Sequence, residues 1–326
     1  MTGSIRPDGD ADPIPAAARI VVGGECLIDR IRSVDGTTQD VAGGGQFNAA
    51  RAIARLGVPV AFLGCISTDV LGGRLLEHLV TDGVATHLVT RTDAPTTMAH
   101  ATLDPDGSAS YRFEIEGTAA PALDREAALR ALAWRPAALH VGTLGLVFQP
   151  VADSLEALVD AIPGDVLLML DPNARPSTIP DIPAWRARIR RLAQRADIIR
   201  ASVDDLGVLG DGTDPVSEAR AMAGTHALVL LTDGPRPVRL VSAAFPVVEL
   251  PLRPGPVVDT VGAGDSFGGA FLAWWLDQGL GRAQLRDAGL ATAGTRVALA
   301  AAAITCSRAG ADPPTRAELG EAWSRR

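Results

Sequence analysis

The sequence predicts a doubly wound α/β fold with a mainly parallel sheet and a small β-sheet lid. From residue 19 onward, short β-branched runs alternate with longer helices rich in Ala and Leu. The chain has 326 residues, 47% of them hydrophobic, which suffices for one large core. Two polar stretches, 31–42 and 95–118, interrupt the alternation. We therefore expect one domain over residues 19–326, with these stretches inserted as lid segments.

The expected parallel strands are the apolar runs between the helices. Strands covered by helices on both faces are nearly continuous in hydrophobic residues. The candidates lie at residues 20–22, 60–63, 139–141, 166–170, 198–199 and 227–231. Ligands of such sheets bind at the carboxyl ends of the strands, and most candidate site residues below follow one of these runs.

The lid is expected from segments without helical periodicity. Residues 96–115 alternate in polarity around Asp104-Pro105-Asp106-Gly107, which is typical of a β-hairpin. The polar segment 31–41 would add strands beside it. Residues 1–18 are rich in Pro, Asp and Ala and contain no apolar signal segment, so we expect a flexible tail there.

Composition argues against several kinds of partner. The net charge is −8, and Lys and Arg form no long cluster, so we expect no nucleic-acid partner. Cys26, Cys65 and Cys306 are far apart and odd in number, which predicts no disulfide framework or zinc site and fits a reducing cytoplasm. The most hydrophobic segment, 289–306, contains Arg296 and several Thr, so we expect a buried helix and no membrane partner.

The run Asp-Thr-Val-Gly-Ala-Gly-Asp-Ser-Phe at 259–267 predicts a phosphate-binding turn at the start of a helix. Free N–H groups at such a start carry partial positive charge, and small residues leave them accessible. The residues concerned are Gly262, Ala263 and Gly264. Asp265 would repel a phosphate, so we interpret it as the base that accepts a proton from an attacking hydroxyl group.

Two alternatives exist for this run. The glycines can make a tight strand-to-helix turn, with Asp265 complementing the helix dipole. A dinucleotide fingerprint fits less well, because Gly268 and Gly269 do not complete its spacing.

Residues 43–57 form a second motif, in which three glycines precede Gln-Phe-Asn and a small-residue helix that Gly57 caps. Together the two motifs resemble the signature regions of the ribokinase-like (PfkB) carbohydrate kinases, namely a glycine pair with Asn and an "ARLG" helix, then "DTxGAGD". The resemblance extends from about residue 20 to 319. It implies a ribokinase-like kinase domain that transfers the γ-phosphoryl group of ATP, with Mg²⁺, to a sugar hydroxyl. A lid would then exclude water from the site.

The resemblance places one group of sugar-binding residues after the first strand and in the glycine motif. These are Asp29, Gly44, Gly45 and Asn48. A carboxylate accepts hydrogen bonds and an amide both donates and accepts them, which matches the two sides of a hydroxyl group. The alternatives are a solvent-facing loop acid for Asp29 and a helix N-cap for Asn48.

A second group follows the expected strand at 166–170. Asp171, Asn173 and Arg175 resemble the "DxNxR" element of the fructokinase and ketodeoxygluconate-kinase branch. We expect Arg175 to steady a phosphate or the lid through its fixed fork of donors. The alternative is a Pro-bounded loop whose polar side chains satisfy their own backbone. Arg112 is a substrate-binding candidate in the lid, and it and other flap arginines would serve a phosphorylated sugar.

The nucleotide is expected at the ends of the next two strands. Ser202 and Asp205 occupy the place of the Asn-x-x-Glu motif of many relatives. Because both side chains are shorter or poorer metal ligands than the Asn and Glu they replace, we expect Asp205 to reach Mg²⁺ only through water. Thr232 and Gly234 fit the family's "TxGxxG" loop, but Pro237 replaces its last glycine.

The resemblance also places Gly264 and the closing loop at Gly310 beside the nucleotide. In many relatives this loop and the backbone near Asp259 and Val261 hold a monovalent cation, so K⁺ is a candidate cofactor here. Lid strands with open edges often pair across a two-fold axis, which suggests a homodimer.

Several segments resemble bacterial fructokinases within the family: 24–29, 95–99, 111–113, 140–146 and 171–176. The leading hypothesis is therefore ATP-dependent phosphorylation of fructose. The alternatives are a kinase of the same family for 2-keto-3-deoxygluconate, ribose, a phosphosugar or a nucleoside, and a non-catalytic sugar-binding regulator.

Overall fold

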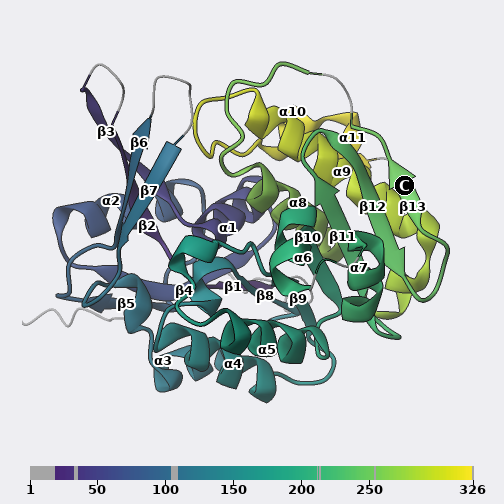
Figure 1. The fold of residues 1–326 in the computed structure, drawn as a ribbon, viewed down its shortest axis with the longest axis horizontal. Coiled ribbons are helices and arrows are strands. Elements are labelled where there is room, and N and C mark those ends of the chain that lie inside the picture. Colours follow the sequence, from purple (N-terminus) through teal and green to yellow (C-terminus); the bar gives the residue numbers. More distant parts are fainter. Residues whose placement is uncertain are drawn as a thin grey trace, which may run out of the picture.

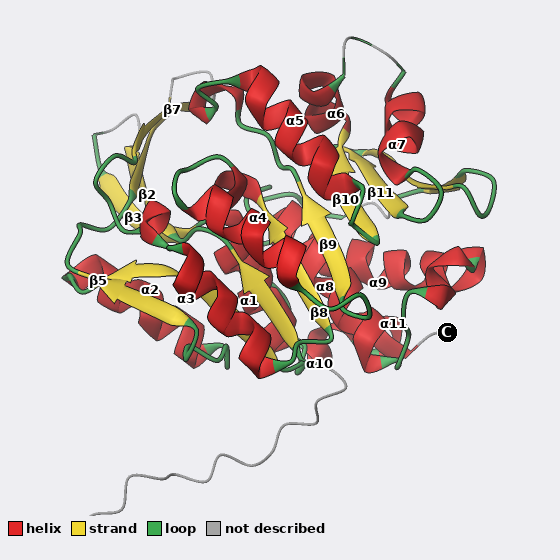
Figure 2. Cartoon of the chain, turned by 90° about the horizontal axis from the view of Figure 1, so that it is seen from below, coloured by secondary structure: helices red, strands yellow, loops and turns green. Residues whose placement is uncertain are grey.

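The computed structural model describes residues 19–324 apart from 33–35, 104–108, 211, 213 and 253–254. The expected tail at 1–18 and the tip of the expected hairpin lie outside the described residues. Within them, helices cover both faces of a nine-stranded sheet, and a separate four-stranded sheet projects from one side (Figures 1 and 2). The α/β fold class with a smaller second sheet is therefore confirmed.

The large sheet has the strand order β13-β12-β11-β10-β9-β8-β1-β4-β5. Its strands are β1 (Ile20–Gly23), β4 (Val60–Ser67), β5 (Val89–Thr92), β8 (Ala138–Gly142), β9 (Leu167–Asp171), β10 (Ile198–Ser202), β11 (Leu228–Asp233), β12 (Arg236–Ser242) and β13 (Val248–Leu250). The pairs are parallel except for those of β12, which is antiparallel to both of its neighbours. Each of the six expected runs coincides with a strand, although the runs at 166–170 and 227–231 begin one residue before β9 and β11. The short edge strands β5 and β13, and β12, were not expected.

One face of the sheet is covered by a helical layer that includes the signature motifs. This layer consists of α1 (Gly45–Arg55), α2 (Val70–Thr81), α8 (Ala263–Asp277) and α9 (Ala288–Cys306). The other face carries α3 (Arg125–Leu129), α4 (Val151–Ala161), α5 (Ile182–Ala193), α6 (Val203–Leu209) and α7 (Pro215–Ala223). The last described helices are α10 (Arg316–Leu319) and α11 (Glu321–Ser324). Helix α8 is apolar on all sides because it lies between the sheet, α1 and α9.

Close helix packing explains two glycines of these helices. A Cβ at Gly269 of α8 would lie 3.0 Å from the carbonyl oxygen of Ala49, so α1 and α8 cross closely there. A Cβ at Gly294 of α9 would lie 3.0 Å from the ring of Phe271 in α8. By length and composition, α9 is the one described helix that could cross a membrane. In this structure α9 packs one face of small residues against α8, and 39% of its apolar window is buried, so the expected burial is found on that face alone.

The smaller sheet has the order β3-β2-β6-β7 and forms the lid. Its strands are β2 (Leu27–Arg32), β3 (Thr38–Gly43), β6 (Met98–Leu103) and β7 (Ala109–Glu114). β6 and β7 form the expected antiparallel hairpin. β2 begins at Leu27, earlier than the expected start of the lid at residue 31, because the chain passes from β1 into the lid after only three residues.

Candidate active site

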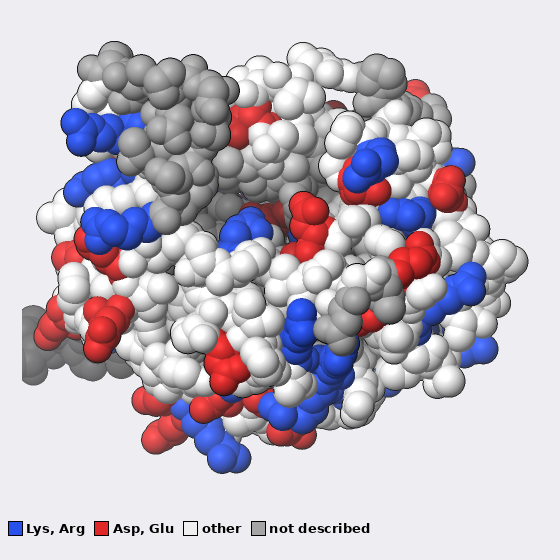
Figure 3. Space-filling view, in the orientation of Figure 1, with Lys and Arg blue, Asp and Glu red and all other residues white. Residues whose placement is uncertain are grey.

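A cavity of about 500 Å³ lies between the lid, the carboxyl ends of the central strands and the first turns of α1 and α8. The space-filling view shows it as a hollow beside the lid, with charged side chains at its mouth (Figure 3). The sequence-predicted residues that line it are Asp29, Gly44, Gly45, Asn48, Asn173, Arg175, Ser202, Val261, Gly262, Gly264 and Asp265. Segments more than two hundred residues apart in sequence thus meet at one site.

The two motifs meet directly through a hydrogen bond. Asn48 Nδ2 in the first turn of α1 donates to Asp265 Oδ2 in the first turn of α8, at 2.9 Å. The chain enters α8 through Gly262, whose φ of 75° is left-handed. A Cβ at this glycine would also lie 2.5 Å from Cβ of Ala311, so both the backbone conformation and the close approach require glycine.

The start of α8 presents backbone donors to the cavity. The Ala263 amide donates to the carbonyl of Thr260 at 3.2 Å. The amides of Gly264 and Asp265, by contrast, have no acceptor among the described residues. Free N–H groups at the N-terminus of a long helix carry partial positive charge and bind anions. The geometry of an anion site is therefore present, with the Asp265 amide as a donor that the sequence reasoning did not name.

The Asp265 carboxyl group is adapted to accept a proton. Its residue is 8% exposed, and burial raises its pKa from 3.8 to about 6, against the lowering effect of the Asn48 hydrogen bond and of Arg200. A base works best when its pKa lies near the working pH. At neutral pH the side chain is therefore ionised and still basic enough to take a proton from a hydroxyl group.

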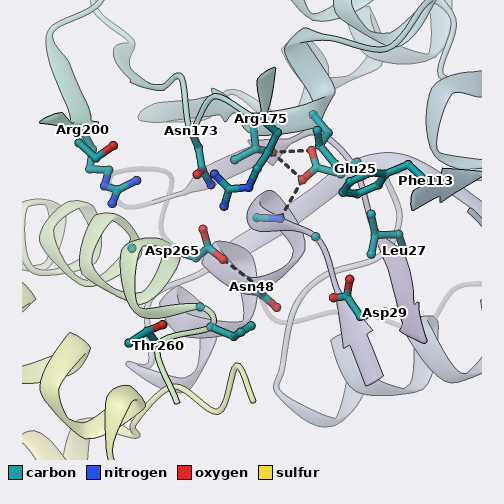
Figure 4. Close-up of a pocket in the computed structure, with 18 of the residues that line it drawn as sticks. Glu25, Leu27, Asp29, Asn48, Phe113, Asn173, Arg175, Arg200, Thr260 and Asp265 are labelled. Atoms are coloured by element: carbon teal, nitrogen blue, oxygen red, sulfur yellow. Dashed lines mark hydrogen bonds between the residues drawn. The ribbon is translucent and has the colours of Figure 1, made fainter. Parts of the chain in front are cut away.

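The side of the cavity where the sequence leads us to expect the sugar, called the sugar side below, combines polar and apolar walls (Figure 4). Asp29 on β2 lies on the same side of the cavity as Asn48, and Arg175 extends toward the space from the opposite side. Burial raises the pKa of Asp29 to about 6, and Arg175 partly offsets this. Leu27 and Phe113, both from lid strands, supply apolar surface. This mixture suits a small polyhydroxylated substrate.

Glu25, which the sequence reasoning missed, holds this part of the site together. It is 1% exposed, and burial raises its pKa. Its Oε1 accepts from the Gly45 amide at 2.8 Å and its Oε2 from the Gly145 amide at 2.8 Å. Thr143 Oγ1 lies 2.6 Å and 2.5 Å from the two oxygens. One carboxylate thus joins the start of α1 to the loop after β8. The available sequence signal was an acid two residues after a buried strand.

Arg200 is the second residue that sequence reasoning did not name as part of the site. It lies on β10, is 8% exposed and lines the cavity. Its Nη1 lies 3.3 Å from Asp171 Oδ1, and its Nη2 donates to Thr232 Oγ1 at 3.2 Å. Burial raises the pKa of Asp171 to about 7, although Arg200 opposes the rise. Asp171 therefore lies behind Arg200 and does not itself line the cavity.

Some predicted residues lie outside the cavity lining. Arg112 is exposed and pairs with Glu114 at 2.9 Å. Asp205 Oδ1 accepts from the Ala174 amide at 2.6 Å, and its Oδ2 accepts from both the amide and the hydroxyl of Ser202 at 2.7 Å. With both oxygens engaged in this way, Asp205 completes the capping box of α6 with Ser202 and fixes the loop that carries Arg175.

Of the remaining predicted nucleotide and cation residues, Gly234, Asp259 and Gly310 lie in loops outside the cavity lining, whereas Val261 lines it. Gly234 forms the left-handed turn between β11 and β12. Asp259 Oδ2 accepts from the Gly310 amide at 2.8 Å, and its Oδ1 accepts from the Val261 amide at 3.0 Å. The loop before α8 is thereby joined to the closing loop. Their roles in nucleotide or cation binding stay predictions.

A buried carboxylate with a raised pKa, beside a helix terminus with free amides and facing a polar cavity, is an arrangement suited to transfer of a phosphoryl group to an alcohol. A model of the pfkB family of carbohydrate kinases matches residues 17–317. The chain belongs to this family, as its two motifs predicted, and is a sugar phosphotransferase.

Individual relatives agree with this assignment. A fructokinase from Rhizobium leguminosarum bv. trifolii is 37% identical over 256 residues, 77% of each chain. Probable fructokinase-4 of Arabidopsis thaliana is 33% identical over 315 residues, 92% of this chain and 95% of the relative. The crystal structure of a fructokinase from Xylella fastidiosa with bound ATP is similar with a TM-score of 0.84 and 25% identity, covering 94% of this chain and 98% of that one.

Proposed function

We propose that this protein is a fructokinase that transfers the γ-phosphoryl group of ATP to a hydroxyl group of fructose. The observation that carries the proposal is the contact of Asn48 with Asp265 at 2.9 Å, at the point where the sugar side of the cavity meets the free amides of α8. A hydroxyl group bound beside Asn48 would lie next to the base, and a phosphoryl group held by the amides of Gly264 and Asp265 would lie on the same helix turn as that base. The names of the relatives favour fructose over other sugars.

Each residue then has a defined task. Asp29 and Asn48 orient the sugar hydroxyls, and Asp265 takes the proton of the attacking one. The amides of Gly264 and Asp265 stabilise the charge on the transferring group. Leu27 and Phe113, carried by the lid, exclude water that would otherwise attack the nucleotide.

We infer that Mg²⁺ enters with the nucleotide. Among the described residues no three His, Cys, Asp or Glu side chains cluster as a metal site, and Asp205 has both oxygens engaged by protein donors. The phosphates would supply direct ligands, and Asp205, which lies outside the cavity lining, would contribute only through water. Mg²⁺ would neutralise charge on the phosphates.

We assign a K⁺ site to the backbone near Asp259 and Val261. The test is whether the enzyme is activated in KCl but not in choline chloride at the same concentration.

The proposal is tested by a coupled ADP-release assay with fructose, ribose, 2-keto-3-deoxygluconate, fructose 6-phosphate and a nucleoside. We expect kcat/KM to be highest for fructose. A higher value for another acceptor reassigns the substrate, and no turnover with any acceptor despite normal ATP binding rejects the kinase function in favour of a sugar-binding regulator.

We further infer a soluble cytoplasmic homodimer that associates through the lid. β3 and β7 are the edges of the lid sheet among the described strands, and unpaired strand edges favour pairing with a second copy. Light scattering coupled to size exclusion tests this: a mass of one chain contradicts it.

A further inference from the structure

A buried cation lies beside the anion site at the start of α8. A Cβ built on Gly264 would lie 2.6 Å from Nη2 of Arg200 and 2.9 Å from its Cζ, so the guanidinium rests against the first turn of the helix. Arg200 comes from β10, on the opposite side of the cavity from Asn48. The close-up shows its guanidinium extending toward the space above Asp265 (Figure 4).

This placement brings two positive groups together. The helix N-terminus carries roughly half a positive charge on its free amides, and the guanidinium carries a full one. In a buried site such groups repel each other more strongly than in water. Against the lowering effect of burial, the carboxylates of Asp171, Asp205 and Asp265 raise the pKa of Arg200 and offset this repulsion. Of these carboxylates, only that of Asp171 is hydrogen-bonded to the guanidinium among the described residues, at the long distances of 3.3 and 3.5 Å. The guanidinium and the free amides thus border the same space, where one anion would contact both.

The hydrogen-bond donors of Arg200 also indicate an anion at this position. A guanidinium has five N–H donors. Nη1 is used by Asp171 and Nη2 by Thr232, while Nε is buried without a partner among the described residues. Buried donors rarely stay unpaired, and each one costs free energy. A ligand that satisfies several of them must offer several acceptor oxygens, as a phosphoryl group does.

We infer that Arg200 is a catalytic residue that binds the terminal phosphoryl group of ATP together with the amides of Gly264 and Asp265. This assignment deepens the proposed kinase function and rests on it. Asp171 acts as a positioning residue that holds the guanidinium in place from behind.

The step is balanced without any change in Arg200. The bond between the sugar oxygen and the γ-phosphorus forms, and the bond from that phosphorus to the β–γ bridging oxygen breaks. The sugar proton goes to Asp265, and the electron pair stays on ADP. Arg200 stays protonated and contributes only charge and directed hydrogen bonds.

The decisive experiment is nucleotide binding by calorimetry to the Arg200→Gln variant without sugar. AMP, ADP and a non-hydrolysable ATP analogue are compared with Mg²⁺ present. We expect AMP affinity to stay within about twofold and the affinity for the ATP analogue to fall roughly 10- to 100-fold. An equal loss for AMP and the analogue, or no loss for either, overturns the assignment.

Kinetics supply a second readout. We expect Arg200→Gln to lower kcat by roughly 10³-fold, the lower end of what a phosphate-binding arginine contributes, with fructose KM little changed. Arg200→Lys keeps the charge but not the planar fork, so it should recover part of the rate. If the Gln variant fails to fold, the Lys variant carries the same comparison. A rate within threefold of wild type in the Lys and Gln variants alike overturns the proposal.

The positioning role of Asp171 is tested by a double-mutant cycle. Asp171→Asn alone should lower kcat roughly tenfold, and it should cause no further loss in the Arg200→Gln background, because residues that act as one unit are not additive. Independent, multiplicative losses contradict the positioning role.

A matched control is Arg282→Gln. Arg282 forms an ion pair with buried Asp197, which lies just before β10 at the other end of the sheet. This variant should lose thermal stability but keep both nucleotide binding and kcat. Selective loss of ATP-analogue binding in Arg200→Gln upholds the assignment even if wild type fails to phosphorylate fructose, so the two proposals fail separately.

Discussion

Replacing Asp265 by Asn should make the protein more stable and nearly inactive. The carboxyl group is buried, and its pKa is raised from 3.8 to about 6 chiefly by burial. The folded protein therefore binds this proton more tightly than the unfolded chain. The resulting stabilisation is complete below about pH 4 and is lost as the pH rises through about 6.

The magnitude follows from the pKa. A rise from 3.8 to about 6 corresponds to roughly 3 kcal/mol of unfolding free energy above pH 6. Asn removes this cost and still accepts the Asn48 hydrogen bond through its carbonyl oxygen. At pH 8 we expect a gain of up to about 3 kcal/mol, or roughly 5 °C in Tm for a chain of this size.

The assay is thermal unfolding of both proteins at pH 8 and pH 5, with turnover measured in parallel. The gain in Tm should shrink at pH 5, where wild type is itself largely protonated at this position. The value of kcat should fall roughly 10²- to 10⁴-fold, with fructose affinity retained. Asp160→Asn, on the exposed end of α4, is the control and should change neither quantity. A loss of Tm at pH 8, or a gain of equal size at both pH values, would show that burial does not raise the pKa of Asp265.

Three further changes should have measurable effects. For wild type, kcat/KM should fall below about pH 6 as Asp265 becomes protonated, and a flat profile between pH 5 and 8 would contradict its role as base. Glu25→Gln places an amide donor against a backbone N–H, and we expect kcat/KM to fall on the order of 10²-fold. The charge of Glu25 also raises the pKa of Asp265. The fall of kcat/KM at acid pH should therefore move to lower pH in this variant. The control is Glu156→Gln, which removes an ion pair on α4 and should leave both features unchanged. Gly264→Ala would bring a methyl group within 2.6 Å of Arg200 Nη2. Steady-state kinetics should show a loss of kcat of at least roughly tenfold, whereas Tm should not fall because Ala favours the helix. Unchanged kcat would show that the contact between Gly264 and Arg200 is unimportant.

The residues that could be predicted from sequence are those that belong to a local pattern. Gly262, Gly264 and Asp265 lie at a helix start, where a glycine-rich turn has a direct physical meaning. Asn48 follows a glycine run in the same way. Their meeting across 217 residues of sequence was inferred from the family resemblance and not from spacing.

Glu25 and Arg200 could not be assigned in this way, because their function lies in long-range contacts. Glu25 binds groups about 120 residues further along the chain, and no periodicity marks such a pairing. Arg200 occupies a buried strand position where a charged residue is unusual, which was the one available signal. For Asp205 the situation is reversed, because a residue expected near the metal has a local structural task. Its carboxylate takes part in the capping box of α6.

The strands show a similar division. Central strands are continuous apolar runs and were recognised, whereas β5 and β13 are edge strands of four and three residues. Their stability comes from pairing with a neighbour and not from their own composition. The start of the lid at Leu27 was missed for the same reason, because β2 is defined by its pairing with β3 and β6.

The most direct test of the account is a crystal structure of the complex with fructose and a non-hydrolysable ATP analogue. We expect one fructose hydroxyl about 2.6–3.2 Å from a carboxylate oxygen of Asp265, with the terminal phosphoryl group at the amides of Gly264 and Asp265. A sugar whose hydroxyl groups all point away from Asp265, or a nucleotide whose phosphates lie away from the start of α8, would contradict it.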